Sequence, residues 1–66
     1  MENKTIFMVF CIEEYKKAGK LTGRQVISLF KKYGVLDYIT DCYEALHVEG
    51  PAYIVEDIDL FIAARS

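Results

Sequence analysis

The sequence predicts an all-α fold, a compact bundle of three helices plus a short C-terminal helix. Apolar side chains recur at helical spacing along most of the chain. One helix carries recognisable signals at both of its ends, and the strand-like run at residues 53–55 is too short to build a sheet. With 66 residues the chain is expected to form a single helical domain, 1–66. A domain this small buries only about 60% of its unfolded surface, so its stability is marginal.

The first helix is predicted from about Lys4 to Ala18. One side of the helical wheel is apolar and is expected to face the core: Phe7, Met8, Cys11, Ile12, Tyr15 and Ala18. The other side is charged near its end, yet Ile6, Val9 and Phe10 also lie on it. These three residues predict a second contact surface, for a partner or for another copy of the chain. The alternative is that the other segments wrap around this helix and cover both sides.

The second helix is predicted between residues 21 and 34. Thr22 is a favourable N-cap, and Gln25, three residues later, completes a capping box. Gly34 is expected to end the helix, because glycine enters the left-handed conformation at little cost. Before this helix, Gly19 is expected to end the first one in the turn 18–20.

A third helix is predicted from about Val35 to Val48, with an apolar stripe of Ile39, Cys42, Tyr43 and Leu46. The turn 49–51 should end it. Residues 51–55 are expected to be extended, because three of their side chains favour strands. A short final helix, about Glu56 to Ala64, then begins with two acids in its first turn.

Charge is sorted along the chain, whose net charge is −2. Six of the eight basic residues lie between Lys16 and Lys32, and seven of the ten acidic residues lie between Asp37 and Asp59. One interpretation is that these are solvated faces that partly pair across the fold. The other is a polar molecule that orients a charged partner.

The residue types needed for catalysis are not arranged for it. His47 is the single histidine, and Cys42, five residues before it, lies on a different helical face. Metal-ligand spacings such as C-x-x-C or H-x-x-x-H are missing, as is a glycine-rich phosphate loop. The carboxylate pairs 13–14 and 56–57 fit a solvated face and a helix start. We therefore expect no enzyme activity, no cofactor and no metal, with His47 at a helix rim against Tyr43.

The location expected from the sequence is the cytoplasm. The apolar run 6–12 is too short for a membrane span and lacks a signal-peptide cleavage site. Cys11 and Cys42 are accordingly expected to be reduced thiols.

DNA binding is the main competing function. The second and third helices, joined at Tyr33 and Gly34, could form a helix-turn-helix. The second of these would read the major groove, but it carries Asp37, Asp41 and Glu44 and no basic residue. Such a face opposes the phosphate attraction that dominates nucleic-acid affinity, so nucleic acid is a disfavoured partner.

Several stretches resemble a family of very short bacterial proteins of unknown function from gut anaerobes. They are residues 7–15, 29–39, 43–47 and 53–62, which include Tyr-Gly-Val, Tyr-x-x-Leu-His and Asp-Ile-Asp. The resemblance implies genes near ADP-ribosyltransferase-like proteins, in a toxin–antitoxin-like arrangement. It supplies no catalytic residues, but it marks Tyr43, His47 and Asp57 as candidates for mutation.

Together these observations predict a small cytoplasmic protein–protein interaction module. Its partner is expected to be another protein, or a second copy in a homo-oligomer, and an antitoxin-like or regulatory role is the expected one. The contact residues expected from the sequence are Ile6, Val9 and Phe10, because they are apolar on an otherwise charged face.

Overall fold

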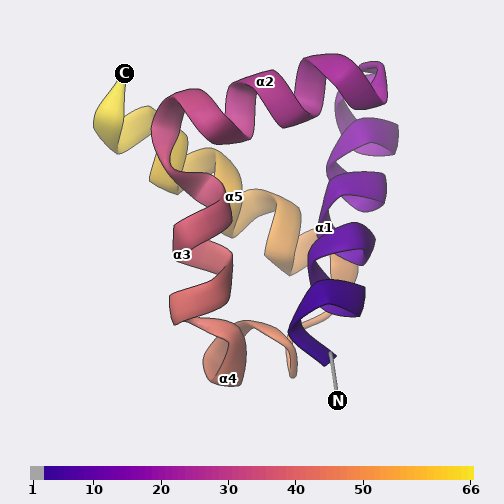
Figure 1. The fold of residues 1–66 in the computed structure, drawn as a ribbon, viewed down its shortest axis with the longest axis vertical. Helices are drawn as coiled ribbons and strands as arrows, with labels where there is room; N and C mark the ends of the chain where they lie inside the picture. The colour runs from indigo at the N-terminus through magenta and orange to yellow at the C-terminus, as the bar shows by residue number, and fades with distance from the viewer. Residues whose placement is uncertain (1–2) are drawn as a thin grey trace.

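Helices dominate the computed structural model, which describes residues 3–66. The five helices are α1 (Asn3–Gly19), α2 (Gly23–Tyr33), α3 (Val35–Asp41), α4 (Tyr43–Leu46) and α5 (Pro51–Arg65). In Figure 1, α1 and α3 form two sides of the molecule, α2 runs across the top between them, and α5 crosses behind. Residues 3–66 contain no strand, which confirms the predicted all-α fold.

The core takes side chains from every helix. Its buried members are Cys11, Val26, Phe30, Val35, Ile39, Leu46, Ile54 and Ile58. α1 packs against α2, α3 and α5, so this helix is the hub of the fold. The radius of gyration is 10.8 Å, which is close to the value of about 11 Å expected for a compact domain of this length.

The end signals of α2 are formed as the sequence predicts. The Gln25 N–H donates to Thr22 Oγ1 at 3.1 Å, and the Thr22 N–H donates to Gln25 Oε1 at 2.9 Å. These two bonds satisfy backbone donors that the first turn of a helix would otherwise leave unpaired. At the other end Gly34 has φ 72°, so it ends α2 in the left-handed conformation.

The end of α1 differs from the prediction in one residue. Lys20, and not Gly19, adopts the left-handed conformation, with φ 54°. The Leu21 N–H donates to the Lys16 carbonyl at 3.0 Å, and the Lys20 N–H donates to the Lys17 carbonyl at 3.4 Å. This pair of bonds is a Schellman motif, which places the left-handed residue just after the helix. A lysine in that position is strained, because its Cβ approaches the following carbonyl.

The single third helix predicted for residues 35–48 is wrong, because the chain bends at Cys42. This residue has φ −104° and ψ 19°, and it separates α3 from α4. One turn earlier, Thr40 Oγ1 donates to the Leu36 carbonyl at 2.9 Å, a back-bond that tends to bend helices. After the bend, Leu46 joins the core with only 2% of its surface exposed.

The extended segment predicted for residues 51–55 is also wrong, and so is the short final helix. α5 begins at Pro51 and is 15 residues long. Proline is well suited to the first helical turn, where its missing N–H costs nothing. Ile54 and Ile58 lie one turn apart and both are buried, so packing outweighs the strand preference of the run 53–55.

Candidate interaction surface

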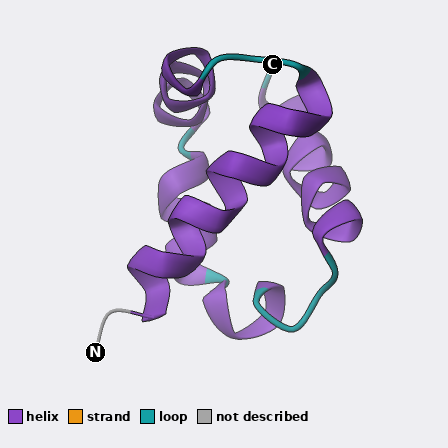
Figure 2. Cartoon of the chain, turned by 90° about the vertical axis from the view of Figure 1, so that its right-hand side faces the viewer, coloured by secondary structure: helices purple, strands orange, loops and turns teal. Residues whose placement is uncertain are grey.

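The outer side of α1 exposes apolar side chains. Ile6 is 67% exposed, Val9 54% and Phe10 38%. Figure 2 shows the outer side of α1 at the front of the molecule, with no other helix in front of it. The other segments therefore leave it open, while the opposite side of α1 places Cys11 in the core.

A chain of aromatic rings extends this apolar side from α1 to α4. The ring centroids of Phe10 and Phe7 are 6.2 Å apart, and those of Phe7 and Tyr43 are 5.5 Å apart with their edges facing. Tyr43 stacks on His47 with centroids 4.5 Å apart and planes 8° apart. We call these rings, together with Ile6 and Val9, the α1–α4 surface. It brings together five of the six candidate residues from the sequence.

His47 lies at the rim of this surface, against Tyr43 as predicted. Its Nδ1 is 2.8 Å from the Tyr43 carbonyl oxygen. Because a carbonyl only accepts hydrogen bonds, this contact assigns the proton to Nδ1 and leaves Nε2 facing outward. The imidazole is exposed and is held by a ring and a carbonyl of the same residue. In this position it can contribute a ring edge and one nitrogen to a binding partner.

Cys11 belongs to the core and has no exposed surface. Burial raises the pKa of its thiol to about 11. The thiol is therefore almost entirely protonated at neutral pH, which makes it a poor nucleophile and a poor metal ligand. Its role in this fold is that of a small apolar side chain.

Asp57, the sixth candidate, takes part in a different contact. Tyr38 Oη donates to Asp57 Oδ2 at 3.4 Å, which links α3 to α5. Burial, followed by the Asp57 charge, raises the pKa of Tyr38. The carboxylate therefore has a structural partner on α3. The sequence resemblance named Asp57 together with Tyr43 and His47, but it gave no reason to expect the three residues close together in space.

A second tyrosine–aspartate bond was missed by sequence reasoning. Tyr15 Oη donates to Asp59 Oδ1 at 2.5 Å and joins α1 to α5. Burial raises the pKa of Tyr15 to about 12, and the hydrogen bond and charge of Asp59 add to the effect. These residues are 44 positions apart, so their pairing follows from the packing of α1 on α5 and leaves no local signal.

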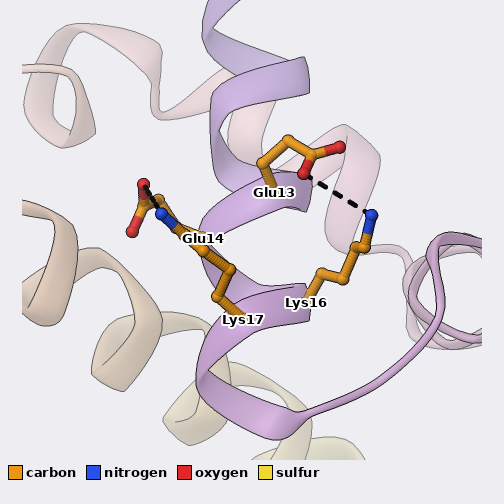
Figure 3. Close-up of polar contacts among 4 residues, drawn as sticks. All are labelled: Glu13, Glu14, Lys16 and Lys17. Atoms are coloured by element: carbon orange, nitrogen blue, oxygen red, sulfur yellow. Dashed lines mark ion pairs between the residues drawn. The ribbon is translucent and has the colours of Figure 1, made fainter.

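Within residues 3–66 the sorted charges do not pair between helices. Figure 3 shows the two ion pairs found among residues 3–66, both within α1. Glu13 and Lys16 are 3.7 Å apart, and Glu14 and Lys17 are 3.4 Å apart. Both pairs join residues three positions apart on the helix. The pairing across the fold, which is part of one of the two interpretations of the sorted charges, is therefore not observed within these residues.

Two kinds of feature are absent from the described residues, a metal-binding cluster and a membrane-spanning helix. Residues 3–66 contain no group of three histidine, cysteine, aspartate or glutamate side chains that could hold a metal ion. Within the same residues, no helix has both the length and the apolar character needed to cross a membrane.

The fold and the exposed surface define a small all-helical protein with exposed apolar side chains on the outer side of α1. Residues 6–65 match the family described as "Protein of unknown function (DUF3791)", and the chain belongs to this family. Neither a curated protein nor a solved structure matches the chain. This match confirms the predicted membership in a family of unknown function.

Proposed function

We propose that this protein is a protein–protein interaction module that binds its partner through the α1–α4 surface. The observation that carries the proposal is the exposure of Ile6, Val9 and Phe10 on a helix whose opposite side is already buried in the core. Exposed apolar surface has a free-energy cost of about 25 cal/mol per Å² relative to burial. A partner that covers these side chains therefore stabilises the complex by burying them.

The spacing of the three residues fits a known mode of recognition. They stand at positions i, i+3 and i+4 of one helix, which is the pattern of anchors that insert into an apolar groove. Phe7, Phe10 and Tyr43 add aromatic surface, and aromatic residues are enriched in interface cores. The charged pairs of α1 lie toward its C-terminal half and would form the polar rim.

The partner in this proposal is a bacterial protein that the chain restrains or regulates. The resemblance to short proteins of gut anaerobes, with genes near ADP-ribosyltransferase-like proteins, favours an antitoxin-like role. A second copy of the chain is the other occupant that the same surface would accept.

Paired substitutions test the proposal. Phe10→Asp should abolish capture of the partner when the tagged chain is purified from its native host and bound proteins are identified by mass spectrometry. Ile27→Asp is the matched control, because Ile27 is 41% exposed on α2, outside this surface. Far-UV circular dichroism should show unchanged helicity in both. Equal capture by the two variants, with masses by light scattering equal to the wild type, would remove the proposal.

A second pair of variants keeps the proposal testable if a variant of the first pair does not fold. Val9→Asp changes a residue that is 54% exposed on α1, and Leu60→Asp changes one that is 64% exposed on α5. The first should reduce capture and the second should not.

A DNA-binding role is tested by a gel shift with the DNA upstream of the gene at moderate salt. A specific shift would favour that alternative, although Asp37 and Asp41 give the exposed side of α3 a negative charge.

A further inference from the structure

A hollow of about 380 Å³ lies where the end of α2, α3 and the C-terminal part of α5 meet. Figure 1 shows these three segments converging on the side of the molecule away from α1. The volume falls within the range of small-ligand sites, about 300–1,000 Å³. The hollow is separate from the α1–α4 surface in its lining residues, since none of that surface's residues lines it.

Aromatic rings form one wall of this hollow. Tyr38 and Phe61 stack with centroids 4.1 Å apart and planes 21° apart. The guanidinium carbon of Arg65 lies 3.7 Å from the centroid of Phe61. A cation over a ring face is attracted by the negative charge of the π-system. The fold thus already places one cation on this wall.

Two carboxylates also belong to the lining of this hollow. Asp37 and Asp41 stand one turn apart on α3, are exposed and line the hollow. Neither makes an ion pair within residues 3–66, and this includes Arg65. Two carboxylates and one guanidinium give the lining a formal charge of −1. The unpaired negative charge lies beside rings that favour positive charge.

We propose that this hollow binds an organic cation, a guanidinium or ammonium group. One face of Phe61 is stacked on Tyr38, so the group lies on the Phe61 face that Arg65 covers, and Asp37 and Asp41 accept its N–H bonds. Arg65 covers part of the same wall and competes with the ligand. The proposal goes beyond the α1–α4 surface and does not depend on it. The cation's source is either a basic side chain of a protein or a small free molecule.

The test is a titration of the full ¹⁵N-labelled chain with N-acetyl-L-argininamide, followed by amide chemical shifts. N-acetyl-L-citrullinamide, which has the same shape without the charge, is the control probe. Saturable shifts at residues of the hollow are expected with the first probe and not with the second. The Phe10→Asp variant should bind the probe as the wild type does, so this result is independent of the proposed function.

Substitutions that are expected to change the affinity for the probe in opposite directions test the proposal further. Asp37→Asn and Asp41→Asn should each weaken binding by roughly two- to fivefold, as expected for exposed charge pairs. Arg65→Ala should tighten it by a similar factor, because it removes a like charge and uncovers Phe61. Glu44→Gln, which removes an exposed acid of α4 that does not line the hollow, should leave binding unchanged.

A blocked peptide of two arginines and two alanines distinguishes the sources of the cation. Tighter binding than that of N-acetyl-L-argininamide supports a basic protein segment, and weaker binding supports a small free cation. The proposal is overturned if citrulline binds as well as arginine, if the Asp37→Asn and Asp41→Asn variants keep wild-type affinity, or if Arg65→Ala weakens binding.

Discussion

Raising the pH from 7 to 10 should weaken the fold through the buried thiol of Cys11. In the unfolded chain this thiol has its ordinary pKa of 9.0, and in the fold burial raises the pKa to about 11. The folded state therefore holds the proton more tightly than the unfolded state does. The resulting stability is fully present below pH 9 and is lost as the pH rises through 11.

The size of the effect follows from these two values. At pH 10 the unfolded thiol is about nine-tenths ionised and the folded thiol about one-tenth, which corresponds to a loss of about 1.4 kcal/mol. Cys11 has no exposed surface, so solvent does not screen this term. A domain of this length has a total stability of roughly 3–10 kcal/mol, and the loss is a measurable part of it.

Urea denaturation at pH 7 and pH 10 under reducing conditions, followed by far-UV circular dichroism, measures the effect. Cys11→Ala should cost about 1–2 kcal/mol at both pH values, because it leaves a small cavity. Its additional loss between pH 7 and pH 10 should be about 1.4 kcal/mol smaller than that of the wild type. Cys42→Ala, which keeps Cys11, should lose as much as the wild type. If Cys11→Ala shows the wild-type pH dependence, the burial argument is refuted.

Local substitutions give further predictions, each checked by urea denaturation. Gly34→Ala should cost about 1 kcal/mol, because the new methyl group meets open space and only the positive φ opposes it. Lys20→Gly should gain roughly 0.5 kcal/mol by relieving the same conformation; a loss would contradict the assigned strain. Thr22→Ala should cost about 1 kcal/mol by removing the cap. Tyr15→Phe should cost about 1 kcal/mol at pH 7, and should flatten the decline in stability above pH 10 that accompanies its raised pKa of about 12; an unchanged decline would count against the raised pKa of Tyr15.

The sequence predicted the parts of the fold that depend on contacts between residues a few positions apart in the chain. The cap at Thr22 and the stop at Gly34 involve residues at most four positions apart, so the sequence shows them directly. The bend at Cys42 and the early start of α5 were missed, because they depend on which side chains reach the core. Ile54 has strand-like chemistry, yet one turn of helix places it beside Ile58 in the interior.

The candidate surface was predictable to a similar extent. Helical spacing alone separated Ile6, Val9 and Phe10 from the core-facing residues of α1, and all three are exposed. Their continuation to Tyr43 and His47 required the packing of α4 against Phe7, a contact between residues 36 positions apart. The hollow lined by Asp37, Tyr38 and Arg65 likewise needs three helices to meet and has no signature in any one of them.

The lack of ion pairs between helices within residues 3–66 separates folding from surface chemistry. Ionic strength should hardly move the unfolding midpoint, whereas a contact with a charged molecule would weaken steeply as salt is added. Charged positions on the outside of this domain, apart from Asp57 and Asp59 with their bonds to tyrosines of other helices, are thus free to diverge between relatives at little cost to the fold. Selection can therefore change the binding partners of the protein while the eight buried side chains stay the same.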